Sequence, residues 1–559
     1  MAPEANAASQ KCDATPKQKL HGRAFYESIG SPKYIVAPMV DQSEYAWRML
    51  TRSFLSDAER PQVLAYTPMF HARLFADTQK YRDSHFQATH ELLLPPSSDT
   101  ETTPAPTTPF LDGNPSTDRP LFVQFCANDP AALLAAARIV APHCDAVDLN
   151  LGCPQGIARK GHYGAFLQED QDLIFRLINT LHLHLDVPVT AKIRILDTRE
   201  ATLAYAQNVL RAGASILTVH GRRREQKGHL TGVADWETIR WLRGQLPRET
   251  VMFANGNVLE HGDLERCIEA TGVDGVMSAE GNLSNPGIFA AAPAEGQGGR
   301  AYWRGRDGKW GWRVDEVFRR YLDIIYGALG REVPKRRALF VPGDEEGWLE
   351  VPVGLPGKKE GEPPRKKRRD EVAKGDEAVM RSPNVVGMQA HLFNLLRHLV
   401  SVHTDVRDAL ARVRMGDFET FEAILAMVEQ KVARGLLDYK RTNGESIAEY
   451  LKVVAVEGIP DEESSAGAVR RCKRPWWVVQ PIIRPLPAEA LVKGAIRPTK
   501  KEMKQEEKKK EEEEAKTKTS NAEQKGPTAS IPADLKSTEE KVNALKRKTS
   551  FAESELVSG

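Results

Sequence analysis

Cysteine is scarce in this chain, and the few thiols cannot form a metal or disulfide framework. Only six occur in 559 residues, and no two lie at the close spacing of a zinc ligand pair. They are Cys12, Cys126, Cys144, Cys153, Cys267 and Cys472. Scattered thiols of this kind are typical of a reducing compartment. We therefore expect no metal site, and a cysteine that does chemistry must act alone.

Long apolar runs are missing as well. No segment reaches the roughly 20 apolar residues that span a bilayer, and the amino terminus lacks the apolar core of a secretory signal. The net charge is only +2, but charge comes in blocks, among them the basic run at 365–369. That run fits a nuclear signal and a solvated loop equally well. We expect an intracellular protein without a membrane anchor, in the cytoplasm, the nucleus or both.

Eight short apolar runs dominate the first half of the chain, and most are followed by a segment of helical length. The runs are 34–40, 62–67, 121–126, 145–150, 187–193, 215–220, 251–255 and 274–278. The helical segments include 130–141, 171–183, 198–212 and 236–245. This alternation predicts an α/β fold, a (β/α)₈ TIM barrel. A doubly wound sheet would carry a glycine-rich fingerprint after its first strand, and none is present there.

Composition divides the chain into five parts. We expect a flexible arm at 1–30, a barrel at 31–312 with a solvated Pro/Thr/Ser insertion at about 94–119, a smaller all-α domain at 313–455 with an insertion at about 331–382, a basic extension with tryptophans at 456–502, and a disordered Lys/Glu-rich tail at 503–559. Apolar residues at helical spacing in 314–329, 384–413 and 418–437 indicate the helices of the all-α domain.

One cysteine stands in a context that suits chemistry. The run at 145–150 leads directly into Gly152, Cys153 and Pro154. A glycine and a proline stop a strand and turn the chain, which lifts the thiol out of the core at the end of the strand. A plain buried thiol remains the alternative at this point.

Polar residues and tight turns gather where the predicted strands end, the face at which barrel enzymes place their active sites. They are Pro38, Met39, Gln124, Asn150, Cys153, Lys192, Arg194, His220, Asn255, Gly256, Asn257, Ala279 and Glu280. The turns after the last two strands suit a cofactor phosphate, although most such turns are only turns. Lys192 lies in an apolar strand and fits either an ion pair or a cation that faces a phosphate or a flavin. His220 fits either a satisfied core histidine or a site residue.

Together these motifs resemble those of the flavin-dependent tRNA-dihydrouridine synthases, most closely the eukaryotic branch that acts on uridines 16 and 17 of the D-loop. The matching stretches cover about 35–290 in the same order. They read APMVDQSE from Ala37, YTPMFHA from Tyr66, DLNLGCPQ from Asp148, AKIR from Ala191, HGRRREQKG from His220, ANGN from Ala254 and AEGNLSNP from Ala279.

The resemblance implies a barrel followed by a helical tRNA-binding domain, FMN as cofactor and NADPH (or NADH) as reductant. It places FMN contacts at Pro38, Met39, Val40, Gln124, Lys192, His220, Asn255, Gly256, Asn257, Ala279 and Glu280. It also implies that reduced FMN delivers a hydride to C6 of uracil while Cys153 donates a proton to C5. A thiol with an ordinary pKa of about 8.5 is mostly protonated at neutral pH, so it can donate. Residues expected to contact the RNA are Asn150, Arg194, Arg222, Arg223 and Arg224.

Two other functions compete with tRNA reduction: a flavin barrel that reduces a free pyrimidine or another small molecule, and a non-catalytic tRNA-binding protein. We expect a monomer whose main partner is tRNA. Residues 470–501 carry nine Lys or Arg against one acid, together with Trp476 and Trp477. Their basic residues are predicted to face tRNA. The tryptophans fit either base stacking or anchoring of the extension on the helical domain.

Overall fold

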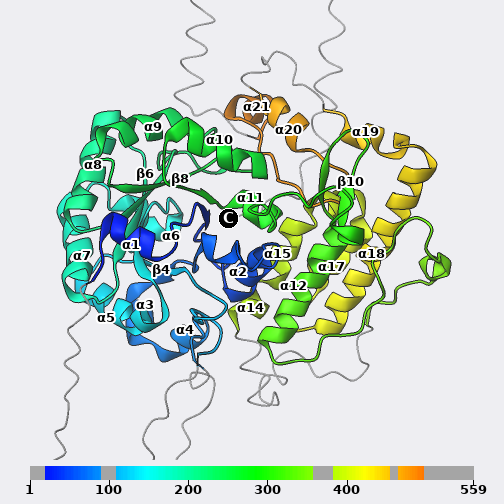
Figure 1. Ribbon diagram of the computed structural model, residues 1–559, viewed down its shortest axis with the longest axis horizontal. Helices are drawn as coiled ribbons and strands as arrows, with labels where there is room; N and C mark the ends of the chain where they lie inside the picture. Colours follow the sequence, from blue (N-terminus) through cyan, green and yellow to red (C-terminus); the bar gives the residue numbers. More distant parts are fainter. Residues whose placement is uncertain (1–18, 90–108, 357–381, 454–463, 496–559) are drawn as a thin grey trace, which may run out of the picture. The chain divides into compact units, whose positions relative to one another are not determined.

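The computed structural model describes residues 19–89, 109–356, 382–453 and 464–495, and the strands between Tyr34 and Ser278 form a closed parallel barrel (Figure 1). The eight strands are β1 Tyr34–Val36, β2 Val63–Tyr66, β4 Leu121–Cys126, β5 Ala146–Leu151, β6 Val189–Arg194, β7 Ile216–His220, β8 Val251–Asn255 and β9 Gly275–Ser278. Because β1 pairs in parallel with both β2 and β9, and β2 pairs with β4, the ring closes. The predicted TIM barrel is therefore confirmed.

The strands follow the predicted runs because both faces of a parallel barrel strand are covered. All six residues of β4 are buried, so the strand reads as one apolar run. The first strand is shorter than the run 34–40, because the chain leaves the sheet after Val36. The two-residue strand β3 (Phe70–His71) lies outside the ring and pairs with the end of β4.

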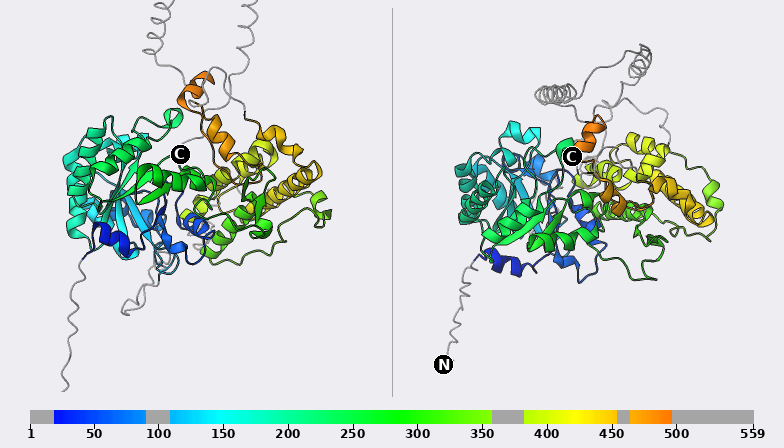
Figure 2. Two further views of the ribbon diagram at one scale, coloured as in Figure 1. Left: turned by 45° about the horizontal axis from the view of Figure 1, so that its top comes forward. Right: turned by 90° about the horizontal axis from the view of Figure 1, so that it is seen from above.

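Helices cover the outside of the barrel. They include α2 (Tyr45–Arg52), α3 (Ala72–Asp77), α5 (Pro130–Val140), α7 (Gln171–His184), α8 (Arg199–Arg211), α9 (Trp236–Gln245) and α10 (His261–Thr271). Helices α7 to α10 each pack against the next one, as the cyan and green ribbons show (Figures 1 and 2). Several begin at a capping side chain: Asp170, Thr198 and Asp235 each accept a hydrogen bond from a backbone N–H of the first turn.

The described end of the expected flexible arm is folded. Residues 22–28 form helix α1 (Gly22–Ser28), in which Phe25 and Tyr26 are buried. The ring of Phe25 stacks on Phe122 with centroids 5.9 Å apart, and the Tyr26 hydroxyl donates to the backbone oxygen of Asp274. Two adjacent aromatic side chains thus tie α1 to the amino ends of the strands. Residues 1–18 lie outside the described residues.

The second half of the predicted insertion at 94–119 is also packed rather than solvated. Arg48 on α2 is fully buried, and its guanidinium donates to Asp118 Oδ1 at 2.9 Å and to Asp112 Oδ1 at 2.8 Å. A buried charge needs such partners, so residues 109–119 are held against the barrel. The first half of the insertion lies outside the described residues.

Beyond the barrel the chain is mainly helical after the hairpin β10 (Tyr302–Arg304) and β11 (Trp310–Trp312). The helices are α12 Val314–Ala328, α14 Pro383–Val386, α15 Met388–Leu395, α16 Arg397–Val402, α17 Thr404–Arg412, α18 Phe418–Arg441, α19 Ala448–Leu451, α20 Ala466–Cys472 and α21 Pro487–Val492. The periodic segment 384–413 forms several short helices, α14 to α17. Residues 490–495 are the described part of a second compact unit, Ala490–Gly559. The predicted domain limits stay a prediction.

The helices contact the barrel through α2. Its preceding residue Glu44 is buried, and its carboxylate lies 2.9 Å from Nε2 of His391 on α15. The His391 ring stacks on Trp47 at 4.1 Å, and the Asn384 side chain accepts the backbone N–H of Ala46 at 2.8 Å. Polar and aromatic contacts therefore join these two parts of the chain.

Candidate active site at the barrel rim

A hydrogen-bonded chain of side chains leads from the barrel interior to Cys153. Thr190 donates to Asp148 Oδ1 at 2.6 Å, and Gln124 donates to Asp148 Oδ2 at 2.8 Å. Asn150 donates to Gln124 Oε1 at 2.8 Å, while its own side-chain oxygen accepts the Cys153 N–H at 2.9 Å. Burial raises the pKa of Asp148 to about 6. Three neighbouring strands thus set the position of the loop that carries the thiol.

The Cys153 side chain is part-buried in a small cluster. Its members are Met69, Cys126, Ala158, Tyr163 and Phe166. Burial raises the pKa of the thiol above its ordinary value, although the charges of Arg194, Lys192 and Lys227 oppose the shift. Cys153 therefore stays protonated at neutral pH.

Gly164 allows a close approach behind the thiol. It adopts φ +64°, and a Cβ at this position would lie 2.9 Å from the Cys153 carbonyl oxygen and 3.0 Å from its Cβ. A side chain here would displace the loop as well as strain the backbone. The next residue, Ala165, donates its N–H to the same carbonyl at 3.1 Å.

Lys192 is a nearly buried cation at the center of the rim. Its ammonium donates to Asn255 Oδ1 at 3.0 Å, and no carboxylate among the described residues forms an ion pair with it. Burial lowers its pKa to about 7, Arg194 adds to that shift, and the nearby charge of Asp148 opposes it. A nearly buried lysine without a carboxylate partner fits an electron-rich ligand, such as an anionic cofactor, better than a structural ion pair.

The neutral His220 and the cationic Arg222 lie together beside the turn after β8. Arg222 Nη1 lies 3.1 Å from Nε2 of His220, and Nη2 donates to the side chain of Asn257. Burial and the charges of Arg194, Lys192 and Arg222 hold the pKa of His220 well below its usual range. The imidazole is thus neutral and accepts from Arg222.

The turns after β8 and β9 fit a phosphate group. Gly256 adopts φ +112° and Asn257 φ +60°, so the turn brings its backbone close to the His220 ring. In the part of the chain that the structure describes, the backbone N–H groups of Gly256, Asn257 and Ala279 donate no hydrogen bond within the protein. Unpartnered N–H groups beside cationic side chains are the donors that phosphate oxygens need. The residues present therefore fit a cofactor phosphate.

The remaining predicted residues occupy less central places. Met39 is buried and its N–H donates to Ser43, Pro38 is half-buried, and Val40 is exposed. Glu280 is exposed at the end of the last turn.

The four predicted arginines differ in their contacts. Arg194 is buried, and its guanidinium donates to the backbone oxygens of Gly152 at 2.7 Å and Arg223 at 3.0 Å. It supports the cysteine loop. Arg223 is exposed and pairs with Asp197. Arg224 lies over the ring of Phe166 at 5.2 Å. Arg222 contacts His220 and Asn257.

From the sequence alone, Cys126 and Tyr163 have no expected role in the site, and Arg484 is among the basic residues expected to face tRNA. Cys126 and Tyr163 contact the reactive loop, and Arg484 of the extension forms an ion pair with Glu280. For Tyr163, the one local signal in the sequence is that it lies in the loop that follows Cys153.

The tryptophans of the extension are anchors. Trp477 is fully buried against Trp303 and Tyr439, and Trp476 packs edge-on against His403. They are therefore not available for stacking on RNA bases.

The basic residues around these tryptophans also make contacts within the protein. Arg471 pairs with Glu260 at 2.7 Å and Arg474 with the same carboxylate at 3.5 Å, while Lys473 donates to the backbone oxygen of Lys452. These contacts tie the extension to the start of α10 and to the end of α19. Their expected role toward tRNA stays a prediction.

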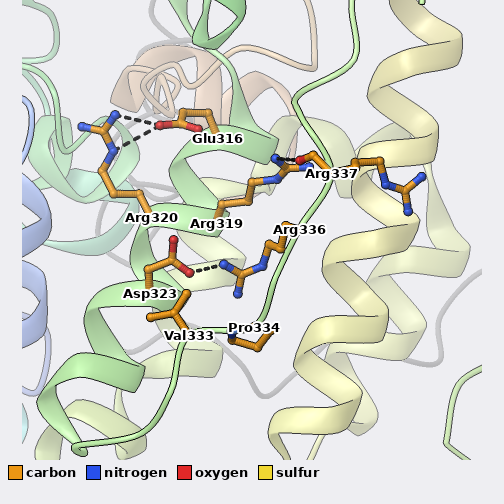
Figure 3. A pocket seen from close by; sticks show the side chains of 8 residues that line it. All are labelled: Glu316, Arg319, Arg320, Asp323, Val333, Pro334, Arg336 and Arg337. Carbon is orange, nitrogen blue, oxygen red and sulfur yellow. Dashed lines mark hydrogen bonds and ion pairs between the residues drawn. The ribbon is translucent and has the colours of Figure 1, made fainter. Parts of the chain in front are cut away.

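A separate cavity of about 360 Å³ lies between α12 and residues 333–337 (Figure 3). It is lined by four arginines, but each has a carboxylate partner: Arg320 with Glu316, Arg319 and Arg337 with Glu429, and Arg336 with Asp323 and Glu422. The lining of the cavity is therefore a network of ion pairs in which each arginine already has a carboxylate partner.

Across the described ranges, no group of three or more His, Cys, Asp or Glu side chains is placed to hold a metal ion. None of the described helices combines the length and the apolar character that a membrane crossing requires.

Fold and site together define a TIM-barrel protein whose polar rim carries a protonated thiol, a buried lysine and a phosphate-fitting pair of turns. The profile of dihydrouridine synthase (Dus) matches residues 35–302. The chain belongs to the dihydrouridine synthase family.

Three relatives show how far the similarity reaches. A protein of Schizosaccharomyces pombe (strain 972 / ATCC 24843), "tRNA-dihydrouridine(16/17) synthase [NAD(P)(+)]", is 40% identical over 85% of this chain and 94% of its own length. The protein of the same name from Saccharomyces cerevisiae (strain ATCC 204508 / S288c) is 42% identical over 84% of this chain and 88% of its own. A human "tRNA-dihydrouridine(20a/20b) synthase [NAD(P)+]-like" protein is 33% identical over 46% of this chain and 70% of its own.

Proposed function

We propose that this protein reduces uridine to 5,6-dihydrouridine in the D-loop of tRNA, at positions 16 and 17. The observation that carries the proposal is the similarity to the two yeast relatives over most of both chains, together with Cys153 at the rim of the barrel. Positions 16 and 17 are favoured because of the share of this chain that each group of relatives covers. The two yeast relatives named for 16/17 align over 84–85% of this chain, whereas the human 20a/20b relative aligns over 46%.

FMN is the cofactor that the rim suits. It supplies hydride transfer to the substrate when bound. Of the residues at the strand ends, Lys192, His220 and Asn255 would face its ring system, and the turns at Gly256–Asn257 and Ala279–Glu280 would hold its phosphate. Pro38, Met39, Val40 and Gln124 complete the contacts. The described strand ends offer one phosphate-fitting pair of turns, and the sequence has no dinucleotide fingerprint after its first strand, which favours FMN over FAD.

Cys153 is proposed as the acid that protonates C5 of the uracil ring. Its raised pKa keeps the proton on sulfur at neutral pH, and Asn150 and Arg194 hold the loop through its backbone. The target base has to leave its stack to reach the rim, which costs less in a loop than in a helix.

The RNA-facing residues are proposed to include Arg223 and Arg224 on the loop after β7, with Asn150, Arg194 and Arg222 acting closer to the base. Arg223 and Arg224 reach the surface of this loop. The reductant is NADPH or NADH, in keeping with the NAD(P)(+) in the names of the yeast relatives. The protein is proposed to act as an intracellular monomer.

Two measurements test this function. The purified protein with NADPH should form dihydrouridine in intact tRNA that lacks the modification, and should leave free uridine unchanged. Turnover of free uridine would instead favour a small-molecule reductase, and bound tRNA without flavin or turnover would favour a non-catalytic binding protein. Mapping dihydrouridine across the tRNA of a strain without this gene identifies the nucleotides.

A further inference from the structure

A residue of the C-terminal extension reaches the turn where the cofactor phosphate is proposed to lie. Arg484 Nη2 is 2.5 Å from Oε1 of Glu280, although the two residues are 204 positions apart. Glu280 follows Ala279, whose N–H has no partner in the described protein. The pair thus sits at the edge of the phosphate-fitting turns.

Glu280 on its own would oppose an anion at this place. A carboxylate beside a phosphate costs free energy, since like charges repel. The contact with Arg484 balances that charge. Within the described residues, the other guanidinium N–H groups of Arg484 donate no hydrogen bond, so the arginine keeps free donors while it is held by Glu280.

A second arginine belongs to the same group. Burial lowers the pKa of the Arg222 guanidinium, the charge of Glu280 opposes that shift, and the charge of Arg484 adds to it. The three charged groups therefore lie near one another and carry one net positive charge. Arg222 also contacts His220, which ends β7, and Asn257, which lies in the turn after β8.

The backbone on both sides of Arg484 is held in place. Val479 donates its N–H to the oxygen of Trp312 at 3.0 Å, and the Pro481 carbonyl lies 3.3 Å from Nε2 of His398. On the other side, the Leu486 N–H donates at 2.7 Å to the buried carboxylate of Glu489. A side chain on so fixed a segment loses little freedom when it binds a ligand.

We propose that Arg484 is a phosphate ligand of the flavin site, so that the extension completes a cofactor site otherwise built by the barrel. The inference rests on the proposed use of FMN. Glu280 positions the guanidinium, and Arg222 flanks it. The arginine fork suits phosphate oxygens better than a lysine does.

The test compares FMN with riboflavin, which lacks the phosphate. Full-length protein is freed of flavin and titrated with each, and quenching of flavin fluorescence gives the two dissociation constants. Arg484→Ala should weaken FMN by about tenfold or more and riboflavin by less than about twofold. Arg484→Lys should weaken FMN less than the alanine variant does. The control Arg407→Ala removes an exposed arginine that also has an acidic partner, Asp408, and should change neither constant.

Every result bears on the inference. Equal weakening of both flavins, or no weakening, overturns it. Riboflavin binding at the wild-type level shows that the variant is folded. If FMN affinity is unchanged but tRNA binding of the FMN-loaded variant falls, the phosphate that Arg484 meets belongs to RNA and the inference is wrong. If the wild-type protein binds no flavin, the proposed function itself fails, which this titration distinguishes from failure at Arg484 alone.

Discussion

The side-chain oxygen of Asn150 accepts the backbone N–H of Cys153 at 2.9 Å, so the penultimate residue of strand β5 sets the position of the thiol that follows it. The same amide donates to Gln124 on the neighbouring strand. The thiol position therefore depends on the barrel and not only on its own loop.

Asn150→Ala should slow tRNA reduction without removing the thiol. The substitution removes three part-buried hydrogen bonds, those with Gln124, Gly152 and Cys153. A loss of about 1–3 kcal/mol corresponds to roughly tenfold or more in rate if the loop shifts. Single-turnover oxidation of the reduced flavin by tRNA measures the step. Reduction of the flavin by NADPH should stay at the wild-type rate, and an unchanged tRNA step would mean that the loop holds its position by other contacts.

Cys153→Ala should bind flavin and accept electrons from NADPH normally, yet fail with tRNA. General acid catalysis contributes about 10²–10⁴-fold, so a defect in that range is expected. Cys267→Ala, a buried thiol on α10, is the matched control and should keep its activity. Turnover of tRNA by the Cys153 variant at a near wild-type rate would show that another group donates the proton.

The pH dependence of the tRNA step follows from the direction of the Cys153 shift. The thiol donates only while it is protonated, and burial raises its pKa. The rate should therefore stay level past the ordinary thiol value of about 8.5 and fall only at higher pH. A decline that begins below that value would contradict the assignment, because it would require a lowered thiol pKa.

Lys192→Met should stabilise the protein freed of flavin while weakening FMN binding. Burial lowers the pKa of Lys192 from 10.5 to about 7, so the folded state disfavours its charge. Between these two values the unfolded chain binds more protons, and the stability of the wild-type protein rises with pH. The advantage of the methionine variant in thermal unfolding should therefore be largest near pH 7 and shrink toward pH 10. A constant difference would mean that charge burial is not its cause.

Trp477→Ala should lower the free energy of unfolding by about 3–5 kcal/mol, because a fully buried aromatic side chain is removed. Denaturant unfolding of the flavin-loaded protein measures the loss.

Removal of 503–559, by contrast, should leave tRNA reduction within about twofold, since that tail mixes both charges and has one aromatic residue, Phe551. A large loss of activity in the truncated protein would place part of the RNA surface in the tail.

The sequence predicted the features that are written in local patterns. Eight buried parallel strands leave eight continuous apolar runs, and Gly152 and Pro154 mark the turn that carries Cys153. The resemblance to a family then assigned roles at the strand ends. Each of these signals lies within a few neighbouring residues.

The missed features depend on partners far apart in the chain. Arg48 has its carboxylates at Asp112 and Asp118, inside a stretch whose composition indicated a solvated loop. Arg484 and Glu280 meet across 204 positions, and neither belongs to a periodic pattern. Short polar pairs of this kind leave no repeat that a sequence pattern can detect.

The contact between Glu44 and His391 limits how this enzyme can be divided. A fragment that stops at the end of the barrel would keep Glu44, Ala46 and Trp47. It would lose the His391 imidazole, which contacts the Glu44 carboxylate and stacks on Trp47, and the Asn384 side chain, which accepts the backbone N–H of Ala46. The surface left behind would combine an unpaired carboxylate with a bare indole. The smallest portion of the chain that folds soundly is therefore larger than the portion that holds the reactive groups.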